Sequence, residues 1–190
     1  MSLLDLEPDT LALDLARWAC PITGADESVL ALAVGPVLDI GCGPGRHVRA
    51  LAHRGVLALG LDAAPEAIHL ARAHGTEILE GSIFDTVPGE GRWATALLLD
   101  GSVGIGGTPV ALLRRVRELL APGGTVLVEG EPPGTPTHTI RARVQVGDHQ
   151  SPSFPWALVA GRDLPDLGRA AGFDRARRWN EGGRWFAALS

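Results

Sequence analysis

Three glycines and one aspartate have the types and the spacing of a nucleotide-binding site. Gly41, Gly43 and Gly45 follow the apolar run at residues 37–40 at every second position, and a helical pattern begins directly after them. Glycine is needed where the backbone takes a positive φ or approaches a ligand with no Cβ in between. The N–H groups at the start of the helix then face the ligand. The stretch predicts a strand, a tight turn and a helix that cradle a nucleotide, although many α/β proteins use such a turn for packing alone.

The aspartate is Asp62, which ends the next apolar run at residues 56–61, about twenty residues after the first glycine. A ribose diol lies at this place in dinucleotide-binding folds. One carboxylate accepts hydrogen bonds from both vicinal hydroxyls in a bidentate, charge-assisted contact. The competing interpretation is that Asp62 only caps the helix that begins near Pro65, because proline suits a first helical turn.

Composition restricts the class of protein. The chain has 190 residues, of which 45% are hydrophobic and 21% charged, and its formal net charge is −5. These values are typical of one globular domain, and the negative charge with dispersed arginines disfavours nucleic-acid binding. The chain contains no lysine and no tyrosine. A Walker-type phosphate lysine, a Schiff-base lysine and a tyrosine general base are therefore excluded.

The two cysteines, Cys20 and Cys42, are too few for a zinc ribbon or an iron–sulfur cluster. We predict no metal site. Nothing suggests a disulfide framework, so we expect a cytoplasmic protein. The N-terminus lacks the basic and apolar segments of a signal peptide, and no apolar run approaches membrane-spanning length.

Hydrophobic periodicity predicts alternating strands and helices. We expect strands at residues 37–40, 56–61, 77–81, 93–99, 125–129, 140–146 and 184–189, and helices at 8–20, 26–33, 46–53, 65–73, 109–120 and 162–171. Most of these strands are near-continuous apolar runs, which is typical of a parallel sheet buried on both faces. The prediction is an α/β fold: a doubly wound, mostly parallel seven-stranded sheet with an antiparallel C-terminal strand, in a three-layer αβα sandwich.

Three segments resemble motifs of one family, the class I S-adenosylmethionine-dependent methyltransferases. Residues 37–45 resemble its first motif, Leu61 and Asp62 its acidic second motif, and residues 119–129 its late helix, Pro-Gly-Gly turn and strand. Nicotinamide-dependent dehydrogenases typically have a third glycine three residues after the second, and here Arg46 stands at that position. The resemblance covers about half of the chain strongly.

The resemblance implies one domain over residues 1–190. Residues 1–35 would form helices that are part of a substrate lid, residues 36–131 the cofactor-binding core, and residues 132–190 the C-terminal strands and substrate-side loops. The implied cofactor is S-adenosylmethionine, with S-adenosylhomocysteine as product.

The resemblance also implies a set of cofactor contacts. They are Asp39, Gly41, Cys42, Gly43, Gly45, His47, Asp62, Ala63, Ser82, Ile83, Phe84, Asp100 and Gly101. Asp39 would help to hold the cofactor ammonium, Asp62 the ribose hydroxyls, and Ala63 would lie against adenine. Ser82 stands where the family often has an acidic residue for the adenine amino group, so either Ser82 or Asp85 would have to supply that contact.

Methyl transfer from a sulfonium needs alignment, exclusion of water and in some cases removal of a proton. Candidates for that proton are Asp100, His138 and His149, and the competing interpretation of both histidines is a surface position. Motifs of DNA-methylating enzymes and an extra domain for a polymer are absent, so we expect a small-molecule acceptor and neither nucleic-acid nor membrane partners.

The acceptor pocket should be formed by loops beyond the strand ends. We expect its walls at Trp18 and at residues 101–107, 131–138 and 148–156. The segment 101–107 has four glycines in seven positions, so it is either a mobile lid or a simple connector.

Two other functions stay open at this point. An NAD(P)-dependent Rossmann oxidoreductase would use the same glycine turn, but the tyrosine–lysine pair of its short-chain members is absent. A non-catalytic S-adenosylmethionine-binding protein is also compatible, because methyl transfer requires no invariant acid or base. The expected oligomeric state is a monomer or a homodimer.

Overall fold

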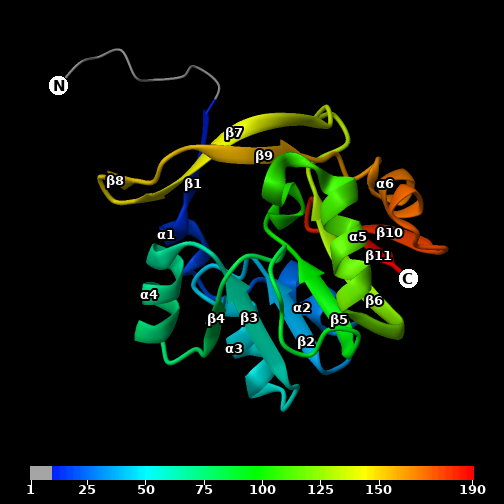
Figure 1. Cartoon of the computed structure of the whole chain (residues 1–190), viewed down its shortest axis with the longest axis horizontal. Coiled ribbons are helices and arrows are strands. Elements are labelled where there is room, and N and C mark those ends of the chain that lie inside the picture. Colours follow the sequence, from blue (N-terminus) through cyan, green and yellow to red (C-terminus); the bar gives the residue numbers. More distant parts are fainter. Residues whose placement is uncertain (1–9) are drawn as a thin grey trace.

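A mostly parallel sheet of seven strands runs through the molecule (Figure 1). The computed structural model describes residues 10–190. The strand order is β10-β11-β6-β5-β2-β3-β4. The strands are β2 (Val37–Ile40), β3 (Ala58–Asp62), β4 (Ile78–Glu80), β5 (Trp93–Leu98), β6 (Leu120–Gly130), β10 (Ala176–Glu181) and β11 (Arg184–Leu189). β2 to β6 are parallel, whereas β11 is antiparallel to both its neighbours. The predicted sheet with an antiparallel C-terminal strand is confirmed.

Helices cover both faces of this sheet and complete the predicted three layers. They are α2 (Gly24–Leu30), α3 (Arg46–His53), α4 (Pro65–Ala73), α5 (Pro109–Leu119) and α6 (Leu164–Ala171). One core cluster joins α5 and α6 to the sheet through residues such as Leu112, Leu164 and Leu98. A second joins α2 and α3 to the other face. The four residues of β2 are all buried, as expected for a strand covered on both sides.

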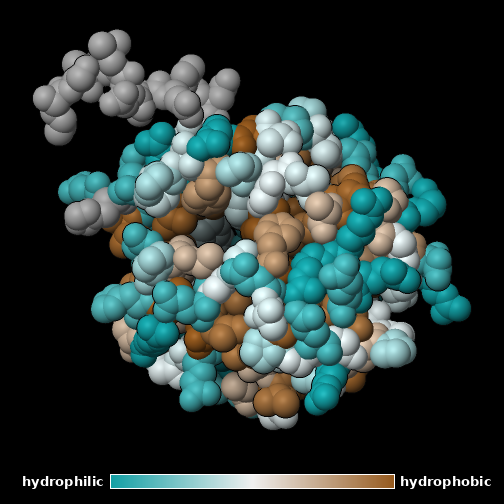
Figure 2. All heavy atoms as spheres, in the orientation of Figure 1, coloured by the Kyte–Doolittle hydropathy of each residue, from teal (hydrophilic) through white to brown (hydrophobic). Residues whose placement is uncertain are grey.

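A second, smaller sheet lies across the carboxyl ends of the central strands (Figure 1). It consists of β1 (Thr10–Asp14), β7 (His138–Val146), β8 (His149–Gln150) and β9 (Phe154–Leu158), and the short helix α1 (Leu15–Trp18) follows β1. β1 is parallel to β7, and β9 is antiparallel to it. On the face shown in Figure 2, apolar residues border the space between the two sheets.

Three predictions of secondary structure were wrong. The helix expected at residues 8–20 is instead a strand and a short helix, and residues 8–9 lie outside the described part. The strand expected at 140–146 exists, but it belongs to the small sheet, and β10 takes its place in the central sheet. The segment 148–156, expected to be a loop, contains β8 and the start of β9. In each case, long-range strand pairing decides the outcome.

The glycine-rich segment after β5 is a 3-10 helix, η1 (Ser102–Gly107). None of the helices in residues 10–190 is both long and apolar enough to cross a membrane.

Candidate functional site

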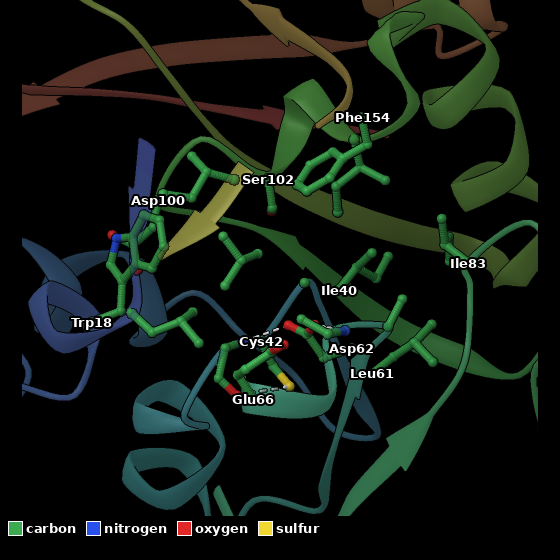
Figure 3. Close-up of a pocket in the computed structure, with 18 of the residues that line it drawn as sticks. Trp18, Ile40, Cys42, Leu61, Asp62, Glu66, Ile83, Asp100, Ser102 and Phe154 are labelled. Carbon is green, nitrogen blue, oxygen red and sulfur yellow. Dashed lines mark hydrogen bonds between the residues drawn. The ribbon is translucent and has the colours of Figure 1, made fainter. Parts of the chain in front are cut away.

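A cavity of about 690 Å³ lies between the central sheet and the small sheet. Its floor comes from the carboxyl ends of β2, β3 and β5, and its roof from β1, α1 and β9 (Figure 3). Open α/β sheets bind their ligands at this edge, and the volume is within the range of roughly 300–1,000 Å³ usual for small-molecule sites.

Two of the three glycines in the turn after β2 face this cavity. Gly41 and Gly43 have φ values of +67° and +54°, and a Cβ on Gly41 would lie 2.8 Å from Cδ1 of Ile105. A Cβ on Gly43 would point into open space, which leaves its backbone accessible to a ligand. Gly45 serves packing, because its φ is +78° and a Cβ there would lie 2.8 Å from Cγ2 of Thr76.

Asp62 connects the end of β3 to this turn. Its Oδ2 accepts a hydrogen bond from the Gly43 N–H at 2.8 Å, and its Oδ1 accepts one from the Ala64 N–H at 2.9 Å. A carboxylate has about four lone-pair sites, so each oxygen keeps acceptor capacity for a diol. Burial raises the pKa of Asp62, against the two backbone hydrogen bonds. Asp62 thus binds the backbone of Ala64, the residue before α4, and also lines the cavity.

A network of charges fixes the floor beside β5. Arg46 donates to Asp26 at 3.1 Å and 3.2 Å and to Asp100 at 2.8 Å. Arg184 donates to Asp26 at 2.6 Å, to Glu129 at 2.7 Å and to Asp100 at 3.1 Å. Both oxygens of Asp100 therefore bind guanidinium groups, and its backbone N–H donates to Glu129 at 2.8 Å. Asp100 takes a positive φ of 54° to reach this position.

His47 lies buried among three carboxylates. Its Nε2 is 3.3 Å from Asp26 Oδ1 and 3.9 Å from Asp100 Oδ2, and its Nδ1 is 3.7 Å from Asp39 Oδ2. Burial acts to lower the pKa of His47, but the hydrogen bond to Asp26 and the nearby negative charges of Asp39 and Asp100 raise it to about 9. His47 is therefore a cation at neutral pH.

The residues fit a ligand that carries a positive charge and a diol. The network holds four carboxylates and three cations: Asp26, Asp39, Asp100 and Glu129 against Arg46, Arg184 and protonated His47. One negative charge is left over. Asp39 lines the cavity, and its Oδ2 is buried without a hydrogen-bond partner among the described residues. A buried acceptor without a donor is costly, so the site favours a ligand with an ammonium group.

Most of the predicted cofactor contacts meet at the cavity. Those that line it are Asp39, Gly41, Cys42, Gly43, His47, Asp62, Ala63, Ser82, Ile83 and Asp100. Gly45, Gly101 and Phe84 do not line it. Phe84 is 48% exposed, and its ring packs beside Gly106 instead.

The predicted bases are less well placed. His138 is exposed at the start of β7 and does not line the cavity; its Nδ1 is 2.9 Å from the Pro136 carbonyl. His149 is in β8, and its side chain lies outside the described part. Asp100 lines the cavity, but its oxygens are bound by Arg46 and Arg184.

Sequence reasoning missed the charge network but found much of the wall. Arg46 could have been found from its place directly after the glycines. No feature of the sequence marks Asp26, Glu129 or Arg184 as members of the site. Trp18 and parts of the segments 101–107 and 148–156 line the cavity as expected, whereas residues 131–138 do not.

Comparison with known proteins agrees with this geometry. Residues 37–124 match a family model described as a methyltransferase domain. An uncharacterised protein of Mycobacterium tuberculosis is 34% identical over 101 residues, which cover 53% of this chain and 34% of that protein. The 2-heptyl-1-hydroxyquinolin-4(1H)-one methyltransferase of Mycobacteroides abscessus is 54% identical over 43 residues. These residues cover 23% of this chain and 19% of that enzyme.

A solved structure extends the likeness to nearly the whole chain. The S-adenosylmethionine-dependent methyltransferase from Bacteroides fragilis, crystallised with S-adenosylhomocysteine, superposes with a TM-score of 0.74 at 25% identity, over 93% of this chain and 79% of that one. The chain therefore contains a segment that matches the methyltransferase domain model, and it shares the fold of this S-adenosylmethionine-dependent methyltransferase. It spans about a third of the length of the uncharacterised mycobacterial relatives that it matches.

Proposed function

We propose that this protein transfers a methyl group from S-adenosylmethionine to a small-molecule acceptor. The observation that carries the proposal is the Gly41–Gly43 turn held by Asp62 at the mouth of a roofed cavity. The Bacteroides fragilis relative binds S-adenosylhomocysteine, which supports the same ligand here.

Individual residues have distinct roles in this proposal. Asp62 accepts hydrogen bonds from the ribose hydroxyls, Asp39 binds the ammonium group, and Ala63 and Ile83 line the adenine side. Gly43 presents its backbone without a side chain in the way. When bound, S-adenosylmethionine supplies a methyl group on a sulfonium, whose transfer to an acceptor lone pair leaves S-adenosylhomocysteine and, from a protonated acceptor, one proton.

The chain then contributes alignment and exclusion of water. His47 carries its proton at neutral pH, so it does not act as a base there. Asp100 binds Arg46 and Arg184, so it does not act as the base either. The proton of the acceptor passes to solvent. The expected cytoplasmic location and the monomeric or homodimeric state stay predictions.

A methyl-transfer assay tests the proposal. The protein is incubated with methyl-labelled S-adenosylmethionine and a panel of small neutral, anionic and cationic molecules, and S-adenosylhomocysteine formation is measured. We expect turnover that depends on the acceptor and falls at least tenfold in Asp62→Asn. Binding of S-adenosylhomocysteine without turnover on any acceptor would support a non-catalytic binding protein. Binding of NAD in its place would support the oxidoreductase.

A further inference from the structure

Three aromatic side chains of the small sheet and α1 face the central sheet across the cavity. Trp18, Phe154 and Trp156 line it, and the rings of Phe154 and Trp156 meet edge to face, with centroids 6.0 Å apart and planes at 67°. Trp18 and Phe154 are only half-buried, and Figure 3 shows them on two sides of the same space. Leu13 and Val144 complete an apolar wall. Such a wall suits a flat ring.

Polar side chains along this wall are bound within their own hairpin. Ser153 Oγ accepts hydrogen bonds from Arg141 Nε at 3.1 Å and Nη2 at 2.8 Å. Ser151 Oγ accepts one from the Val144 N–H at 3.0 Å and donates to the Pro152 carbonyl at 2.9 Å. These hydroxyls are committed to the protein, so the wall offers little to a ligand with many polar groups.

Charged ligands also lack a partner at the wall. Among the described residues that line the cavity, the cations are Arg46 and His47, and both are bound by carboxylates. Asp100 is held by two guanidinium groups. Asp39 and Glu66 also line the cavity, but they belong to β2 and α4 and are not part of the wall. Burial of a charge without a partner is costly, so at the wall itself a neutral ligand is favoured over an anion or a cation.

Ser102 offers a polar group to a ligand that lies against this wall. Ser102 is 4% exposed, and its Oγ is buried with no hydrogen-bond partner among the described residues. Ser102 lines the cavity beside the glycine turn, because a Cβ on Gly41 would lie 3.1 Å from its Cβ. In Figure 3 it points into the space between Trp18 and Phe154. A buried hydroxyl without a partner is unfavourable unless a ligand supplies one.

We propose that this part of the cavity is an acceptor subsite for an uncharged, flat aromatic ring with one hydrogen-bonding heteroatom. The ring lies between Trp18 and Phe154, and the heteroatom binds Ser102 Oγ. Naming this ligand as the methyl acceptor rests on the proposed function, but the binding site itself does not. Ser102 sets specificity by positioning the heteroatom next to the glycine turn.

Equilibrium dialysis of the protein with and without S-adenosylhomocysteine tests the subsite, since neither condition allows methyl transfer. The probes share one ring system: 2-naphthol, naphthalene, 2-naphthoate and 2-naphthylmethylammonium. We expect 2-naphthol to bind at least tenfold more tightly than either charged probe. Equal or tighter binding of a charged probe, or no binding of 2-naphthol up to about 1 mM, which is a binding free energy of only about −4 kcal/mol, overturns the proposal.

Variants locate the binding. Trp18→Ala and Phe154→Ala should weaken 2-naphthol binding at least tenfold while their affinity for S-adenosylhomocysteine stays within about twofold, a difference of about 0.4 kcal/mol. Ser102→Ala should reduce binding of 2-naphthol to that of naphthalene, whereas Ser153→Ala, whose hydroxyl is held by Arg141, should not. If 2-naphthol binds all variants alike, the subsite is wrong. If S-adenosylhomocysteine fails to bind while the probe pattern holds, the proposed function fails and the subsite stands.

Discussion

At the scale of the residue, Asp26 organises the floor of the site although it lies in α2, outside the family motifs. Its side chain is fully buried, and burial acts to raise its pKa. Hydrogen bonds from His47, Thr23 and Arg184 and the charge of Arg184 outweigh burial and hold the pKa of Asp26 below its usual range. The reciprocal capping contacts of Thr23 and Asp26 place this carboxylate at the start of α2.

Arg46→Met should destabilise the protein by roughly 3 kcal/mol, because it leaves the buried charge of Asp26 with fewer partners. Urea unfolding at neutral pH measures this. The matched control is Arg54→Met, which removes a partly exposed ion pair to Glu27, another residue of α2. The control should cost at most about 1 kcal/mol. Equal losses in both variants would show that the buried network does not stabilise the fold.

The raised pKa of His47 predicts a stability that falls with pH. Its pKa is about 9 in the folded protein and 6.5 in the reference state, so between these values the folded protein retains a proton that the unfolded chain has lost. The stabilisation is complete below pH 6.5 and is lost as the pH rises through 9. The free energy of unfolding should fall by about 2 kcal/mol between pH 6 and pH 8.5.

Urea unfolding at several pH values compares the wild type with His47→Gln and with His53→Gln, which changes an exposed histidine on the same helix. The fall should be absent in His47→Gln and retained in His53→Gln. The difference between the wild type and His47→Gln separates the contribution of His47 from that of other groups that titrate in the same window. The same fall in His47→Gln would contradict the assignment.

The residues of the glycine turn and Asp62 were predictable because one local segment and one strand end carry them. The charge network around Arg46 was not, since its other members Asp26, Glu129 and Arg184 come from three elements distant in sequence. Their convergence depends on tertiary packing, which no local pattern encodes.

At the scale of the element, the small sheet shows where periodicity fails. Leu11, Leu15 and Trp18 are spaced as on a helix, yet residues 10–14 pair in register with residues 141–145 of β7. A short apolar pattern fits either structure, and the partner strand decides. β10 was missed because most of its residues are polar and exposed, as befits the edge of a sheet.

The packing of η1 supports the connector interpretation of the glycine-rich segment. A Cβ on Gly104 would lie 2.2 Å from the Ala157 carbonyl oxygen and 2.6 Å from Trp156 Nε1. Gly104→Ala should therefore separate η1 from β9 and destabilise the protein by about 2 kcal/mol. Thermal or urea unfolding measures this against Gly134→Ala, where a Cβ meets nothing within 4 Å. Unchanged stability in Gly104→Ala would indicate a loose segment, as a lid requires.

At the scale of the whole molecule, the central sheet could be predicted from the sequence, whereas the small sheet that forms the roof of the cavity could not. The central sheet follows from near-continuous apolar strands and their crossovers. The small sheet pairs β1, near the N-terminus, with strands in the last third of the chain, so its pairing could not be deduced from either segment. The cavity between the two sheets combines a polar floor with an aromatic roof.

Calorimetric titration of S-adenosylhomocysteine and NAD into the wild type, Asp62→Asn and Glu80→Gln tests the central claim most directly. Glu80 ends the neighbouring strand β4 outside the cavity, so it is the matched control. The wild type and Glu80→Gln should bind S-adenosylhomocysteine alike and not bind NAD, while Asp62→Asn should bind at least tenfold more weakly, as loss of a charged hydrogen bond implies. Preference for NAD, or unchanged binding in Asp62→Asn, would contradict the account.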